Sequence, residues 1–165
     1  MLLQRNDTNP NTPDTEYGQT PLWCAATNGH EEVVRMMLPR NDVNLNTPDT
    51  EYGRTPLCCA AVKGHEEIVR MLLEQTNVNP DPPDTKYSRT PLLWAAANSH
   101  ERVVRMLLEQ SDVNPDTPNT ESGQIPLSCA ALNRHERIVK ILLQRNDVNP
   151  GKANRWGHTL PLSAA

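Results

Sequence analysis

Histidine and glutamate stand side by side at four places in the chain, and zinc enzymes use this pair of side chains to bind metal and activate water. The segment GHEEVVRMML begins at Gly29 and returns as GHEEIVRMLL, SHERVVRMLL and RHERIVKILL, which begin at residues 64, 99 and 134. In the helical H-E-x-x-H motif, two histidines one turn apart face the same metal ion and the glutamate acts as the base. Each copy could therefore be half of a metal site.

The copies lack the second histidine of that motif. Four residues after His30, His65, His100 and His135 the chain carries Val34, Val69, Val104 and Val139. Successive copies that stack as packed helices lie about 10 Å apart, too far for their histidines to share one ion. We therefore expect each histidine to hydrogen-bond a turn between helices, and we predict no metal site and no cofactor. A metal hydrolase that uses the His–Glu pairs is the enzyme alternative.

The four cysteines also repeat. Cys24, Cys59 and Cys129 share one position of the repeated phrase, and neighbours in that position lie a helix spacing apart, beyond the roughly 7 Å that a disulfide spans. We expect buried thiols in a reducing compartment. Cys58 falls in a variable position, and we expect it to be accessible to oxidation or to a partner. With no glycine-rich phosphate loop and no nucleophile beside a free base, we predict no catalytic activity.

Composition narrows the classes of partner. The 165 residues carry a net charge of −4 with both signs interspersed, which argues against nucleic acid as a partner. No apolar run approaches the roughly 20 residues of a membrane span, and the first ten residues lack the apolar centre of a secretory signal. With 15 prolines and no phenylalanine, the core must be built from Leu, Val, Ile, Ala and Met. These observations predict an intracellular protein, in the cytoplasm, without membrane contact.

A period of 35 residues organises the whole chain, because the histidines and Pro21, Pro56, Pro91, Pro126 and Pro161 all recur at that interval. We expect one domain over residues 1–165. Its predicted units are a partial repeat at 1–10, full repeats at about 11–45, 46–80, 81–115 and 116–150, and a partial repeat at 151–165.

Each unit predicts two short helices and a loop. A threonine before each of the first three prolines, as at Thr20, suits a helix N-cap, and proline suits the first helical position. The first helix runs about eight residues to Gly29 or its equivalent; Ser99 and Arg134 occupy that position at a cost in strain. The second helix begins at the His–Glu pair, and Pro39 should shorten its first copy. Each of the four second helices is expected to form one i,i+4 ion pair. The pairs are Glu31–Arg35, Glu66–Arg70, Glu101–Arg105 and Glu136–Lys140.

The Asp- and Pro-rich stretch that follows the second helix is predicted to be an extended finger. One valine of each copy should anchor its base in the core, and the four are Val43, Val78, Val113 and Val148.

Helix, turn, helix and finger, with TPL, AA, GH and LL at fixed places, closely resemble the ankyrin repeat, whose usual period is about 33 residues. The resemblance implies an all-α solenoid of stacked helix-turn-helix units. The long finger resembles fungal ankyrin arrays. The histidine that usually follows TPL is replaced here by Trp23, Cys58, Leu93 and Ser128.

Positions that differ between copies are free of the folding constraint, so they are the candidates for binding a protein partner. The resemblance places them on finger tips and on the concave face of the first helices. Aromatic side chains are enriched at binding hot spots, which favours Trp23 and Trp156, whereas the tyrosines could instead pack finger on finger. The candidate positions are Glu16, Tyr17, Gln19, Trp23, Asn28, Glu51, Tyr52, Arg54, Cys58, Lys63, Lys86, Tyr87, Arg89, Leu93, Asn98, Glu121, Gln124, Ser128, Asn133, Arg155 and Trp156.

These expectations predict a non-enzymatic protein-interaction module within a larger intracellular signalling or scaffold protein. The chain starts within a second helix and stops within a first helix, without polar terminal units. The alternative is therefore a structural or decoy fragment that has no specific partner and associates with itself end to end.

Overall fold

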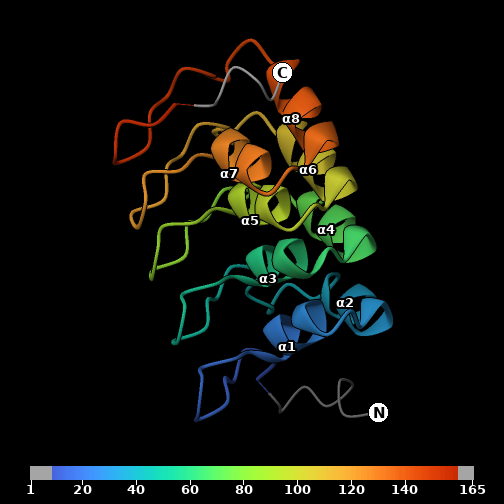
Figure 1. The fold of residues 1–165 in the computed structure, drawn as a ribbon. Coiled ribbons are helices and arrows are strands. Elements are labelled where there is room, and N and C mark those ends of the chain that lie inside the picture. The colour runs from blue at the N-terminus through green and yellow to red at the C-terminus, as the bar shows by residue number, and fades with distance from the viewer. Residues whose placement is uncertain (1–8, 160–165) are drawn as a thin grey trace.

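The fold is a stack of helix pairs, seen in a computed structural model that describes residues 9–159. Within this range eight short α-helices form four pairs, stacked one on the next, with the fingers projecting to one side (Figure 1). The first helices of the pairs are α1 Pro21–Thr27, α3 Pro56–Lys63, α5 Pro91–Ala97 and α7 Pro126–Leu132. The second helices are α2 Glu31–Met37, α4 Glu66–Leu73, α6 Glu101–Leu108 and α8 Glu136–Leu143.

Local signals determine where the first helices begin. The hydroxyl oxygens of Thr20, Thr55 and Thr90 each accept a hydrogen bond from the backbone N–H three residues later, at 3.2, 3.2 and 3.3 Å. This confirms the predicted caps. Ile125 cannot cap, and there the hydroxyl of Ser128 accepts from the backbone N–H of Ile125 at 3.0 Å. At α7 a side chain therefore satisfies the N–H of the N-cap residue, and not the N–H three residues later that the threonines satisfy in the other first helices.

The turn between the two helices of a pair requires a left-handed residue. Gly29 and Gly64 adopt φ of 73° and 74°, and Ser99 and Arg134 adopt 65° and 59° at the same place. The strain predicted for these two residues is therefore present. The early end predicted for the second helix before Pro39 is also confirmed, because α2 ends at Met37 while α4, α6 and α8 each run one residue further in the repeat.

The core lies between the stacked helices. Each first helix packs on the next first helix, and each second helix on the next second helix. Ala26, Ala60 and Ala95 are fully buried, and these small side chains let neighbouring first helices approach closely. Val43, Val113 and Val148 are 5–7% exposed at the finger bases, as predicted, while Val78 is half-buried.

Neighbouring fingers are joined near their tips by backbone hydrogen bonds. The N–H groups of Thr50, Thr85 and Thr120 donate to the carbonyl oxygens of Tyr17, Tyr52 and Tyr87 at 2.8–2.9 Å, and the N–H of Arg155 donates to Ser122 at 2.8 Å. This row of bonds fixes each finger against the next. Because Ser122 accepts the same bond as the tyrosines, these contacts are independent of the tyrosine side chains.

Along residues 9–159 the helices are all too short to cross a membrane. The incomplete helices expected at residues 1–3 and from Pro161 onward lie outside the described residues.

Candidate partner-binding surface

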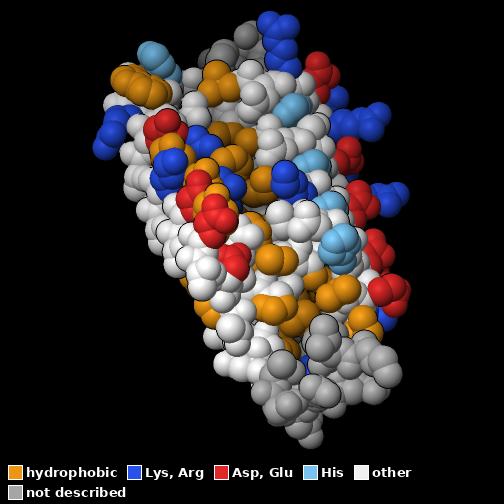
Figure 2. Space-filling model, turned by 90° about the horizontal axis from the view of Figure 1, so that it is seen from below, with side chains coloured by type: hydrophobic (Ala, Val, Ile, Leu, Met, Phe, Trp, Pro, Cys, Tyr) orange, Lys and Arg blue, Asp and Glu red, His pale blue; other side chains and the backbone are white. Residues whose placement is uncertain are grey.

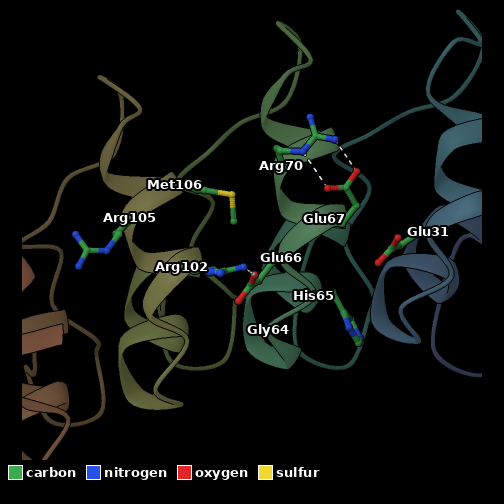
Figure 3. A pocket seen from close by; sticks show the side chains of 9 residues that line it. All are labelled: Glu31, Gly64, His65, Glu66, Glu67, Arg70, Arg102, Arg105 and Met106. Carbon is green, nitrogen blue, oxygen red and sulfur yellow. Dashed lines mark hydrogen bonds and ion pairs between the residues drawn. The ribbon is translucent and has the colours of Figure 1, made fainter. Parts of the chain in front are cut away.

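The His–Glu pairs lie on the side of the stack away from the fingers. A shallow pocket of about 660 Å³ lies there, over α4 and its neighbours α2 and α6 (Figure 3). His65 lines it, but its Nε2 lies 3.1 Å from the carbonyl oxygen of Thr27, in the last turn of α1. His100 and His135 make the equivalent contacts with Val62 and Ala97, each at 3.0 Å. These three bonds therefore run to the last turn of the preceding first helix and not, as predicted, to the turn between helices, and each joins one helix pair to the preceding pair.

Two glutamates of these pairs, Glu66 and Glu101, form ion pairs with arginines. Glu66 pairs with Arg102 of the following pair at 3.0 Å, and Glu67 pairs with Arg70 (Figure 3). Of the four predicted i,i+4 pairs, all of them within the described residues, Glu101–Arg105 is formed, at 3.1 Å. The predictions of Glu31–Arg35, Glu66–Arg70 and Glu136–Lys140 are wrong; Glu66 instead pairs with Arg102. Over residues 9–159 no three His, Cys, Asp or Glu side chains converge as a metal site would require. The chemistry on this face is charge pairing, both within a second helix and between neighbouring repeats.

Figure 2 shows the histidines in a row along one face, beside a border of acidic and basic side chains, with a mixture of apolar and charged side chains along the opposite edge. The candidate residues divide by exposure. Those exposed to solvent are Glu16, Tyr17, Asn28, Glu51, Lys63, Lys86, Asn98, Glu121, Asn133, Arg155 and Trp156. Those half-buried are Gln19, Trp23, Tyr52, Arg54, Tyr87, Arg89, Gln124 and Ser128.

Two candidates cannot reach a partner in this fold. Cys58 is 0% exposed and Leu93 is 1% exposed, so the expected accessibility of Cys58 is wrong. Both side chains sit in α3 and α5, which have a first helix stacked on either side, and the stacking covers their column. Trp23 and Ser128, in the same column of α1 and α7, remain half-buried.

Burial also determines the reactivity of the thiols. It raises the pKa of Cys59 to about 12 and that of Cys129 to about 11, and it raises the pKa of Cys58 well above its ordinary value. A thiol reacts as the thiolate, so these three are inert near neutral pH. Cys24 is only half-buried, and burial raises its pKa as well.

On the finger side, aromatic rings and guanidinium groups stack into one group, here called the Trp94 cluster: Tyr52, Arg54, Tyr87, Arg89 and Trp94. The Cζ of Arg54 lies 4.6 Å from the centre of the Tyr52 ring and 4.5 Å from that of Trp94. The Cζ of Arg89 lies 4.9 Å from Tyr87 and 4.6 Å from Trp94. Each contact is worth about 0.5–2 kcal/mol, more as water is excluded. The cluster therefore holds these side chains in fixed positions.

A buried carboxylate orients the cluster. The indole N–H of Trp94 donates to Asp84 Oδ2 at 3.0 Å, and the Nε of Arg54 lies 3.9 Å from the same oxygen. The other oxygen of Asp84 accepts the backbone N–H groups of Tyr87 and Arg89. Asp84 is 2% exposed, so its carboxylate oxygens are bound by groups of the protein and not by solvent.

One repeat earlier, a pocket of about 210 Å³ opens between the fingers and the first helices. Its apolar wall includes Trp23, Tyr52, Cys59 and Val62. Its polar wall includes Gln19, Asp49, Glu51, Arg54 and Lys63. The indole N–H of Trp23 is already satisfied, because it donates to the carbonyl oxygen of Arg54 at 2.8 Å. Trp23 therefore contributes a ring face to this pocket.

The sequence interpretation missed three important side chains of this surface. Asp49 and Asp84 were not selected, although the Pro-Asp step that recurs before each Tyr-Gly or Tyr-Ser turn was visible. Trp94 stands at the repeat position shared by Cys24, Cys59 and Cys129, and it was not among the candidate residues. The signal that could have found it is the single large aromatic residue in a column of cysteines.

The fold and this surface define a class, the helical repeat proteins built of stacked helix pairs. A family model described as ankyrin repeats (3 copies) matches residues 1–84 and, again, residues 77–154. The chain belongs to the ankyrin-repeat family. Members of this family generally act as non-enzymatic protein-interaction modules and usually work inside cells. A comparison with curated proteins found no match.

Proposed function

We propose that this chain binds a protein partner through the surface formed by its finger tips and first helices. The observation that carries the proposal is the set of aromatic side chains on the first three fingers and on the last finger of the described residues; the fourth finger carries Ser122 at this position. Tyr17 is 39% exposed and Trp156 is 62% exposed, while Tyr52 and Tyr87 are half-buried between charged side chains. Isolated surface aromatics are ordinary. Tyr17, Tyr52 and Tyr87 occupy the same position of three neighbouring fingers, and grouped aromatic side chains are of the type that anchors partners.

The fixed geometry of the fingers supports binding. The backbone bonds fix the fingers, and the Trp94 cluster orders the side chains of Tyr52 and Tyr87, so a partner would not have to supply that ordering on association. Ordered aromatic side chains lose little further freedom when covered. The charges near the tips are of both signs, with Lys86 and Arg89 beside Glu51 and Glu121, which suits a polypeptide partner better than a polyanion.

The test is a peptide-display selection against the full chain, followed by affinity measurements of the selected peptides. Tyr17→Ala combined with Trp156→Ala should weaken binding at least about tenfold, since exposed aromatic anchors are the residues that cost most on truncation. The matched control changes two exposed residues of the second helices, Glu32→Ala and Arg137→Ala, whose side chains are 84% and 89% exposed. This control should leave the affinity within about twofold.

Equal loss in the two double variants, or no loss in either, would contradict binding through the fingers. Light scattering across a concentration series runs alongside. A mass that grows with concentration and does not depend on the finger residues would favour the alternative of self-association. We also infer that binding takes place in the cytoplasm, which imaging of the tagged chain in cells would test.

A further inference from the structure

We infer that the 210 Å³ pocket accepts a tryptophan side chain of the partner, with the indole N–H directed to Asp49; this inference rests on the proposed function. The evidence for this inference comes from the equivalent positions in the next repeat of the same chain. Shifting Trp94, Arg54, Arg89 and Asp84 back by one 35-residue period gives four residues of the pocket wall. The next repeat therefore shows what these positions hold when an indole is present.

The equivalence covers the indole position itself and three polar groups around it. In the later repeat, Trp94 lies against Arg54 and Arg89 and donates to Asp84. The positions 35 residues earlier are Cys59 for Trp94, Gln19 for Arg54, Arg54 for Arg89, and Asp49 for Asp84. All four line the pocket. Because the small side chain of Cys59 stands where the indole stands in the next repeat, the space beside Gln19, Asp49 and Arg54 remains open.

The polar end of the pocket has an acceptor to offer. Asp49 is 3% exposed. Its Oδ1 accepts the backbone N–H of Tyr52 at 2.6 Å, whereas its Oδ2 accepts only the backbone N–H of Arg54, at 3.3 Å. In Asp84, the same Oδ2 atom accepts the indole N–H of Trp94 at 3.0 Å. A buried carboxylate oxygen with one long hydrogen bond favours a ligand that brings an N–H donor.

The volume of the pocket also indicates which type of side chain it can hold. Pockets for drug-sized ligands measure about 300–1,000 Å³. An engineered cavity of about 150 Å³ in another protein binds benzene, so 210 Å³ fits a single bicyclic side chain. The ring of Trp23 and the guanidinium of Arg54 line the pocket and offer faces for stacking. The opening lies among fingers and first helices, on the proposed binding surface.

The test uses N-acetyl-tryptophanamide as the probe and backbone amide shifts of the full chain as the readout. We expect saturable shifts at Gln19, Trp23, Arg54 and Val62. The 1-methylindole analogue, which has no N–H, should bind about tenfold more weakly. Shifts that do not saturate at these residues would overturn the inference, as would equal affinity for the methylated analogue or tighter binding of N-acetyl-leucinamide.

Two variants copy other repeats of the same chain. Cys59→Trp installs the residue found at Trp94 and should fill the pocket, which abolishes probe binding while the fold is retained. Asp49→Asn installs the residue found at Asn119, whose Oδ1 still holds its turn through the N–H of Ser122 at 2.7 Å. It should reduce the preference for the free indole N–H to less than about threefold. Probe binding that survives Cys59→Trp, or a preference unchanged in Asp49→Asn, would overturn the inference.

The same variants separate this inference from the proposed function. Selected peptides that carry tryptophan and lose at least about tenfold in affinity to Cys59→Trp support both. Peptides that depend on Tyr17 and Trp156 but lack tryptophan and bind Cys59→Trp unchanged would leave the proposed function standing and overturn the inference. Saturable probe binding together with peptides indifferent to the finger variants would support the pocket and count against binding through the fingers.

Discussion

The imidazole Nε2 of His100 lies 3.0 Å from the carbonyl oxygen of Val62, 38 residues earlier in the chain. Gly64, two residues after that carbonyl, is so close to the ring that an added Cβ would come within 2.4 Å of its Nδ1. The residue that looked like half of a metal site therefore connects one repeat to the next. Its position at the head of each second helix places one such bond between successive helix pairs.

His100→Ala should lower the free energy of unfolding by about 1–2 kcal/mol, because it leaves the carbonyl of Val62 without this partner and loses the packing on Gly64. His30→Ala is the matched control, since His30 is exposed, and it should change stability by less than about 0.5 kcal/mol. Urea denaturation followed by circular dichroism measures both. Equal effects of the two substitutions would contradict the connecting role.

Ser99→Gly should stabilise the protein by about 1 kcal/mol, because Ser99 adopts φ of 65° at a position where two other repeats carry glycine. Such a gain raises the melting temperature by about 2–4 °C in a chain of this size. Gly64→Ala, the reverse change at the equivalent turn, should destabilise, since the new methyl group would meet His100. Calorimetry of both variants measures these shifts, and a lower melting temperature for Ser99→Gly would contradict the strain.

Asp81 gives the protein a pH dependence of its own. Burial raises the pKa of its carboxyl group from 3.8 to about 6. Between these two values the folded state binds more protons than the unfolded state, so this group lowers stability as pH rises through the window. Asp81→Asn installs the residue found at Asn46, whose Nδ2 donates to the carbonyl of Asn77.

At pH 7.5 this substitution should stabilise the protein by about 1 kcal/mol, and near pH 4 the gain should disappear. Denaturant titrations at the two pH values measure the difference. Asp112→Asn, which makes the same change of charge at an exposed position, is the matched control. Asn114→Ala is not used as the control, because it changes the finger itself. A gain of the same size at both pH values would show that Asp81 is not the titrating group.

Alkylation should separate the cysteines. At pH 8 in the native state, iodoacetamide should modify Cys24 first, whereas Cys58, Cys59 and Cys129 react only after denaturation, because burial raises each pKa and blocks access. Peptide mass spectrometry after timed labelling identifies the sites. Rapid labelling of Cys58 in the native state would contradict this prediction and would show that Cys58 is accessible, as its variable position suggested.

Local chemistry explains what the sequence determined by itself. The caps at Thr20, Thr55 and Thr90, the strained turns at Ser99 and Arg134, and the early end of α2 before Pro39 all depend on residues within one helical turn. Such signals act at the same place in every copy. The 35-residue period then determined the stacked fold, because a repeated amphipathic unit can bury its apolar face only against its neighbours.

The tertiary structure decided which side chains meet and which reach solvent. Stacking on both sides buried Cys58 and Leu93, although their positions vary as freely as that of Trp23. Glu66 forms an ion pair with Arg102 of the next repeat and not with Arg70 of its own helix. The ring of Trp94 lies against the guanidinium groups of Arg54 and Arg89. These contacts join residues of different repeats or distant parts of one repeat, and their outcome depends on packing distances that no local pattern encodes.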